Sequence, residues 1–131
     1  MTHADFELAQ LLLRILLAFV FFGMGILHFL PKVARGMAAM IPPRIRRGDL
    51  LRPINLVYFT GVCEIAGAVG LLLPATRVAA ALALVVFLIA VFPANAYAAK
   101  HREKFGRTAI PLWPRLVAQL VLIGLCIVTV V

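Results

Sequence analysis

The sequence predicts an all-α integral membrane protein in which four antiparallel helices form a bundle, with both termini on the non-cytoplasmic side. Of its 131 residues, 64% are hydrophobic, and its mean hydropathy of +1.07 is far above that of soluble globular domains. The charged residues make up 14% of the chain and gather in two stretches that separate long apolar runs. This length and spacing fit one membrane domain over residues 1–131.

The first predicted span runs from about Phe6 to Leu30 and ends at Pro31. It exceeds the roughly 20 residues that cross about 30 Å of hydrocarbon, and only Arg14 and His28 interrupt it. A cleaved signal peptide has Lys or Arg before its apolar core, and this segment has neither there. We therefore expect the segment to be retained as a helix.

A basic connection follows, from Pro31 to Pro53, and it is broken by Pro42 and Pro43. Apolar residues repeat at helical spacing before the two prolines, which predicts a short interfacial helix there. The basic side chains of this connection are Lys32, Arg35, Arg44, Arg46, Arg47 and Arg52.

Three further spans are predicted at about residues 54–73, 77–99 and 112–131. The turn Pro74–Arg77 is short enough to make the second and third spans antiparallel neighbours. The last connection is basic and contains Lys100, Arg102, Lys104 and Arg107.

The distribution of Lys and Arg predicts the orientation. The two long connections carry ten of them, whereas the short turn carries Arg77 alone and the N-terminal tail carries none. The positive-inside rule therefore places both long connections in the cytoplasm, where anionic lipid headgroups would attract them. The formal charge of +8 is explained in this way without a nucleic-acid partner. The basic residues expected at the membrane surface are Arg44, Arg46, Arg47, Lys100, Arg102 and Lys104.

Polar side chains inside the spans are the candidate site, because ionisable groups are costly to place in a bilayer. At a rise of about 1.5 Å per residue, Arg14 and Glu64 both fall near mid-bilayer and can face each other. Such a pair would either only hold the two helices together, or it would also line a ligand cavity or carry protons.

His28 lies fourteen residues after Arg14, so both share one helix face. It should sit near the cytoplasmic end, level with Asn95, which follows a helix kink expected at Pro93. A histidine at this depth is either part of a site or an interfacial hydrogen-bonding residue. The candidate ligand-binding or buried polar residues are Arg14, His28, Glu64 and Asn95.

Cys63 and Cys126 are predicted to be buried small hydrophobic side chains, because they lie in apolar runs at different depths. The sequence has no cysteine or histidine cluster of metal spacing, no dinucleotide-binding glycine motif and no second membrane histidine for bis-histidine haem. No metal site, intrinsic cofactor or self-contained catalytic motif is predicted.

Four segments in register resemble the DoxX family of small four-helix membrane proteins, in particular its DoxX-like branch. They are Arg14 followed by Gly25–Pro31, then Met40–Pro43, then Thr60–Gly67, then Phe92–Asn95. The resemblance implies a four-helix bundle in the bacterial cytoplasmic membrane and an association with quinone-linked redox complexes. By position, it makes Arg14, His28, Glu64, Pro93 and Asn95 the family-type polar and kink residues.

Three functions are consistent with the sequence. The first is a non-catalytic or accessory subunit that binds a lipophilic small molecule, such as a quinone, beside a partner oxidoreductase subunit. The second is an assembly or interaction factor whose polar residues only hold the bundle together. The third is a small proton-coupled transporter, which the strongly biased topology and the position of Glu64 in the second span disfavour.

Overall fold

The computed structural model describes residues 2–42, 52–100 and 112–131, which contain five α-helices and no strand. The all-α prediction is confirmed for this part of the chain. Three segments are long and apolar enough to cross a membrane, namely His3–Leu27, Pro53–Leu72 and Arg77–Ala94, and a shorter apolar helix covers Trp113–Val128. The helices are α1 (His3–Leu27), α2 (Pro31–Ala39), α3 (Pro53–Leu72), α4 (Arg77–Lys100) and α6 (Leu112–Val128).

The helix ends follow local sequence signals. Thr2 caps α1 in a capping box with Asp5, which satisfies two backbone donors of the first turn. Both α2 and α3 begin with a proline in their first turn, where its missing N–H costs nothing. The short helix expected before Pro42 is α2. Pro93 lies inside α4, which continues through it to Lys100, and the expected kink there stays a prediction.

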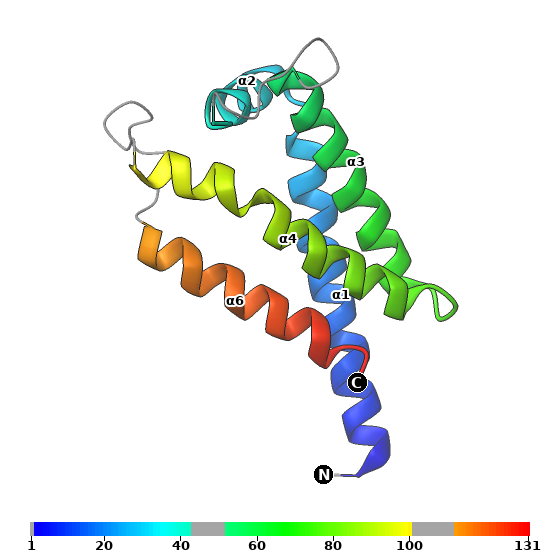
Figure 1. Cartoon of the computed structure of the whole chain (residues 1–131). Helices are drawn as coiled ribbons and strands as arrows, with labels where there is room; N and C mark the ends of the chain where they lie inside the picture. The colour runs from blue at the N-terminus through cyan, green and yellow to red at the C-terminus, as the bar shows by residue number, and fades with distance from the viewer. Residues whose placement is uncertain (1, 43–51, 101–111) are drawn as a thin grey trace.

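The long helices pack in sequence, α1 on α3, α3 on α4 and α4 on α6, and α6 also contacts α1. Figure 1 shows that α1 and α3 run in opposite directions, with α2 lying across their upper ends against α3. The turn between α3 and α4 and the C-terminal end of α6 lie toward the lower end, and the N-terminal turns of α1 extend beyond them (Figure 1). From that turn, α4 diverges from α3 toward Lys100 (Figure 1).

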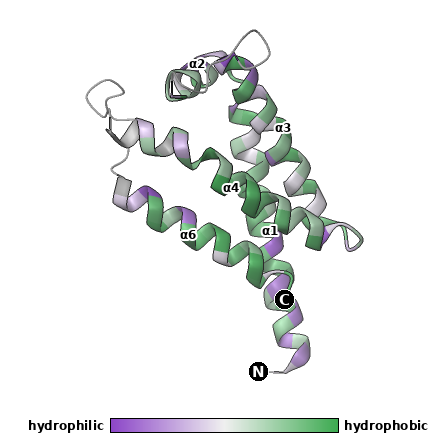
Figure 2. Cartoon of the chain, in the orientation of Figure 1, coloured by the Kyte–Doolittle hydropathy of each residue, from purple (hydrophilic) through white to green (hydrophobic). Residues whose placement is uncertain are grey.

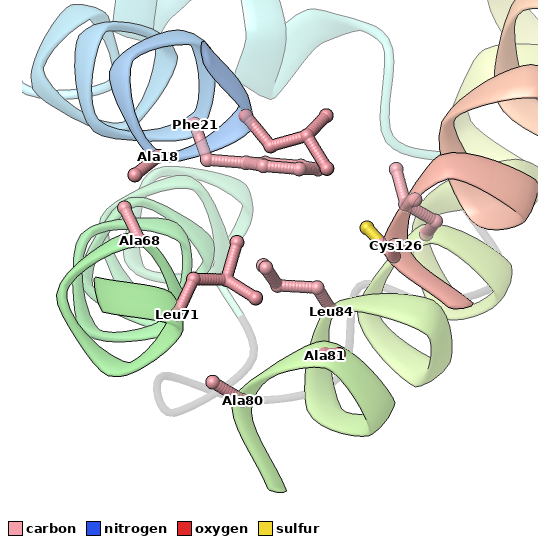
Figure 3. Packing of buried hydrophobic residues seen from close by; sticks show 10 residues of the cluster. Ala18, Phe21, Ala68, Leu71, Ala80, Ala81, Leu84 and Cys126 are labelled. Atoms are coloured by element: carbon pink, nitrogen blue, oxygen red, sulfur yellow. The ribbon is translucent and has the colours of Figure 1, made fainter. Parts of the chain in front are cut away.

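The core is built from stripes of buried residues with helical spacing. On α1 the stripe includes Leu17, Ala18 and Phe21, and on α3 it includes Ala68 and Leu71. These side chains meet residues of α4 and α6, as Figure 3 shows. Cys126 is one of them and is a free thiol, as is the half-buried Cys63.

The outer surfaces of the helices are also apolar. Phe19, Phe59 and Val86 are exposed at 78%, 65% and 65%. Figure 2 shows hydrophobic residues over much of α3, α4 and α6, whereas hydrophilic residues gather at the start of α1. Exposed apolar area of this extent suits lipid contact rather than water.

Two glycines bring α1 and α3 into close contact. A Cβ atom at Gly25 would lie 2.7 Å from Ile65 Cγ1 and 2.9 Å from the Gly61 carbonyl oxygen, and a Cβ at Gly61 would lie 2.8 Å from His28 Cβ. Only glycine fits at both positions. Because the helices are antiparallel, this contact fixes which residues of α1 and α3 share a level.

Candidate functional site

His28 and Glu64 form a buried pair across the contact between α1 and α3. His28 Nδ1 lies 3.2 Å from Glu64 Oε2, and the two side chains are exposed at 11% and 8%. His28 is the C-cap of α1, and Glu64 belongs to the buried stripe of α3. Gly61 lies against His28, and because it has no side chain, His28 can approach α3 this closely.

The hydrogen bonds of the pair define its chemistry. His28 Nδ1 lies 2.6 Å from the carbonyl oxygen of Met24. A carbonyl oxygen can only accept, so Nδ1 carries a proton and donates it to Met24. Glu64 Oε2 is buried and has no hydrogen-bond partner within the described residues. The pair therefore holds an oxygen that can bind one further polar group.

Aromatic side chains lie next to the pair. Phe29 and Tyr58 stack with ring centroids 5.6 Å apart and planes inclined by 3°, and Phe29 also touches the position of Gly61. The nearby Thr60 hydroxyl donates to the Val57 carbonyl oxygen at 2.8 Å, so its proton is already used within its own helix. The Phe29 ring thus packs at the same α1–α3 contact that holds His28 and Glu64.

Arg14 does not face Glu64, contrary to the sequence-based expectation. It is buried, and its Nη1 donates to the carbonyl oxygen of Thr129 at 2.7 Å. The reason is the register of α1 and α3. Arg14 lies eleven residues before Gly25, and Gly25 faces the Gly61–Ile65 segment of α3. Because α3 runs in the opposite direction, Arg14 is level with the residues eleven positions after that segment, which lie at the α3–α4 turn. Arg14 is therefore about 12–18 Å along the helix axis from Glu64.

Sequence reasoning missed the polar groups that surround Arg14 at the end of α6. Gln10 donates to the carbonyl oxygen of Val128 at 2.9 Å, and the Thr129 hydroxyl donates to the carbonyl of Cys126 at 2.7 Å. Arg14 and Gln10 thereby satisfy carbonyl groups that a helix C-terminus leaves unpaired. The spacing of Gln10 and Arg14, one turn apart on one face, was the available signal.

A second missed group is Gln119 on α6, which is buried and whose Oε1 has no hydrogen-bond partner in the described chain. A single amide in an apolar run gives no indication of which way it faces, so the sequence could not identify it.

Several predicted residues cannot be placed in a site. Asn95 lies in α4, but its side chain is outside the described residues, as is the side chain of Lys100. Arg44, Arg46, Arg47, Arg102 and Lys104 also lie outside the described residues. Within the described ranges, no group of three or more His, Cys, Asp or Glu side chains could hold a metal ion.

The described chain is thus an all-helical protein with three candidate membrane spans and a buried His–Glu pair between two of them. It belongs to the family described as a domain of unknown function, DUF8561, whose model matches residues 17–129. His28 and Glu64 lie inside the matched segment, and Arg14 precedes it. No curated protein and no solved structure matches the chain.

Proposed function

We propose that this protein is a multi-pass membrane protein that binds a lipophilic molecule of the quinone class beside His28 and Glu64, as a non-catalytic accessory subunit of a membrane redox system. The observation that carries the proposal is the buried Glu64 Oε2, which lies 3.2 Å from His28 Nδ1 and lacks a hydrogen bond within the described residues. A buried acceptor without a hydrogen bond lowers the stability of the fold unless another group donates to it.

A quinone fits the chemistry of the pair in both of its redox states. The quinone carbonyl accepts a hydrogen bond, and the quinol hydroxyl donates one. A carboxyl group serves either form, since it donates when protonated and accepts when ionised. His28 Nε2 can accept a hydrogen bond from the quinol hydroxyl, because Nδ1 already holds the proton directed at Met24.

The bilayer supplies a route for such a ligand. Phe59 and Val62 lie on the outward side of α3, away from its buried stripe, and are exposed at 65% and 56%. In the proposed arrangement these residues face lipid, where quinones dissolve. The ligand would reach the pair along α3 without crossing water.

In this proposal the chain crosses the bacterial cytoplasmic membrane four times, as an antiparallel bundle with both termini outside and the basic connections inside. The alternating helix directions in Figure 1 and the ten basic residues of the two connections support it. The resemblance to the DoxX family supports the redox association and an oxidoreductase partner. Because the chain has no electron carrier of its own in this proposal, the quinone or the partner would carry the electrons.

An assembly factor with a purely structural polar core is the second candidate. It is favoured by Arg14, whose hydrogen bond to Thr129 joins α1 to the end of α6 without any ligand. In that case the His28–Glu64 pair would likewise serve only to join α1 and α3.

The test is native mass spectrometry with organic extraction of wild-type, Glu64→Gln and Glu7→Gln protein, purified from membranes in mild detergent. Glu7→Gln makes the same change at a side chain that is 66% exposed. We expect wild type and Glu7→Gln to retain a quinone or a related lipophile, and Glu64→Gln to retain at least about tenfold less, which corresponds to one lost hydrogen bond to a charged group.

An empty wild type would contradict ligand binding, and equal cargo in all three proteins would contradict the assigned site. Either result, together with loss of thermal stability in Glu64→Gln, would favour the assembly factor.

A further inference from the structure

A second polar site lies at the opposite end of α1 from His28. A groove of about 510 Å³ is lined by the N-terminal half of α1 and the start of α4. Its lining contains two guanidinium groups, those of Arg14 and Arg77, together with the amide of Gln10 and the apolar side chains of Leu8 and Leu11.

The two arginines have few partners. Arg14 is exposed at only 6%, and its hydrogen bond to Thr129 uses one nitrogen of a group that has five N–H donors. Arg77 Nε is buried and has no hydrogen-bond partner in the described chain. Neither arginine forms an ion pair with an acidic group within residues 2–42, 52–100 and 112–131.

The electrostatics of the groove favour an anion. Two cations share one cavity and repel each other. The one acidic residue of the lining is Glu7, which is largely exposed and already faces His3 at 3.5 Å. Two partly desolvated guanidinium groups without a counter-charge are costly, and an oxyanion that accepts from both would offset that cost.

The position of the groove indicates where the anion comes from. Because of the register of α1 and α3, Arg14 is level with the α3–α4 turn, and Arg77 is the first residue of α4. In the proposed membrane arrangement this level is the outer headgroup layer. Leu8 and Leu11 line the same groove, so an acyl chain can lie beside the charged groups.

We infer that Arg14 and Arg77 bind the phosphate group of an anionic phospholipid at the non-cytoplasmic end of the helices. Guanidinium groups match phosphate oxygens with paired N–H donors. This site is separate from the cytoplasmic basic connections and from the pair formed by His28 and Glu64.

The test is native mass spectrometry of the full-length protein titrated with phosphatidylglycerol or with phosphatidylcholine of the same acyl chains. Arg77→Gln is the main variant, because Arg77 has no hydrogen bond to another helix within the described residues, so its loss should leave the fold intact. Arg35→Gln is the matched control, since it removes the same charge from an exposed position on α2. Thermal unfolding of each variant checks folding.

We expect wild type and Arg35→Gln to bind phosphatidylglycerol at least about tenfold more tightly than phosphatidylcholine, and Arg77→Gln to lose that preference. Arg77→Lys should show a partial loss, because it keeps the charge without the paired donors, and it replaces Arg77→Gln if that variant does not fold. Equal binding of the two lipids by wild type, or an equal loss in Arg35→Gln, would overturn the inference.

Inorganic phosphate distinguishes the source of the oxyanion. Displacement of phosphatidylglycerol by millimolar phosphate would support the site and would show that free phosphate is enough to occupy it. Retention of the lipid would support the site and would show that binding also requires the acyl chains.

Discussion

Alanine at Gly25 is expected to lower the free energy of unfolding by about 2–3 kcal/mol, near the upper end of the range for overpacking a core. The added Cβ would meet the Gly61 carbonyl oxygen at 2.9 Å and the Ile65 backbone nitrogen at 3.2 Å. Backbone atoms cannot move aside by a change of rotamer, so α1 and α3 must separate. The pair formed by His28 and Glu64 would then separate as well, because both residues lie at this contact.

Gly23→Ala is the matched control, because a Cβ there has no neighbour within 4 Å. Both variants make the same change in the same helix, so the gain in helix propensity cancels between them. Unfolding in mixed detergent micelles, followed by circular dichroism, measures the difference. Equal stability of the two variants would show that the close contact of α1 and α3 does not exist.

Replacing His28 with leucine is expected to cost about 3 kcal/mol, because it leaves the buried carboxyl of Glu64 without its only described partner. Replacing Glu64 with leucine should cost less, at about 1 kcal/mol, because His28 keeps its hydrogen bond to Met24. The double replacement should cost little more than Glu64→Leu alone. The expected coupling is therefore about 3 kcal/mol, the difference between the summed single costs and the cost of the double replacement.

A double-mutant cycle in the same detergent measures this coupling. Gln119→Leu provides the control pair with Glu64→Leu, since Gln119 is a buried polar residue on α6, which packs on α4 and α1 rather than on α3. Its effect should add to that of Glu64→Leu within about 0.5 kcal/mol. A cycle in which His28 and Glu64 are also additive would contradict their interaction.

Periodicity and helix-breaking residues were enough to predict the all-helical class and most of the helix boundaries. The prolines at residues 31, 53 and 74 and the apolar runs between the basic stretches gave the helix boundaries to within a few residues for α1, α3 and the start of α4. The length of α6 was overestimated, because the apolar run from Leu112 to Val131 continues past the end of the helix at Val128. Hydrophobicity alone does not mark a helix C-terminus.

The composition of the site was predictable, but its pairing was not. A charged residue in an apolar run must find a partner, so Arg14, His28 and Glu64 could all be expected to be buried, and they are. The sequence-based depths of these residues in the membrane were measured from the ends of their own spans. That estimate assumes that neighbouring spans end at the same level. The contact between Gly25 and Gly61 sets a different register, which brings His28 to Glu64 and Arg14 to Thr129.

Both proposed sites depend on the membrane arrangement, and single-cysteine labelling tests it most directly. Cys63 and Cys126 are first replaced with alanine, and one cysteine is then introduced at Thr2, Ala75, Gly48 or Gly106. An impermeant maleimide is applied to spheroplasts before and after permeabilisation. We predict that Thr2→Cys and Ala75→Cys label in intact spheroplasts, and that Gly48→Cys and Gly106→Cys label only after permeabilisation. Labelling of Ala75→Cys and Gly48→Cys from the same side would contradict the four-pass arrangement and, with it, the placement of both sites.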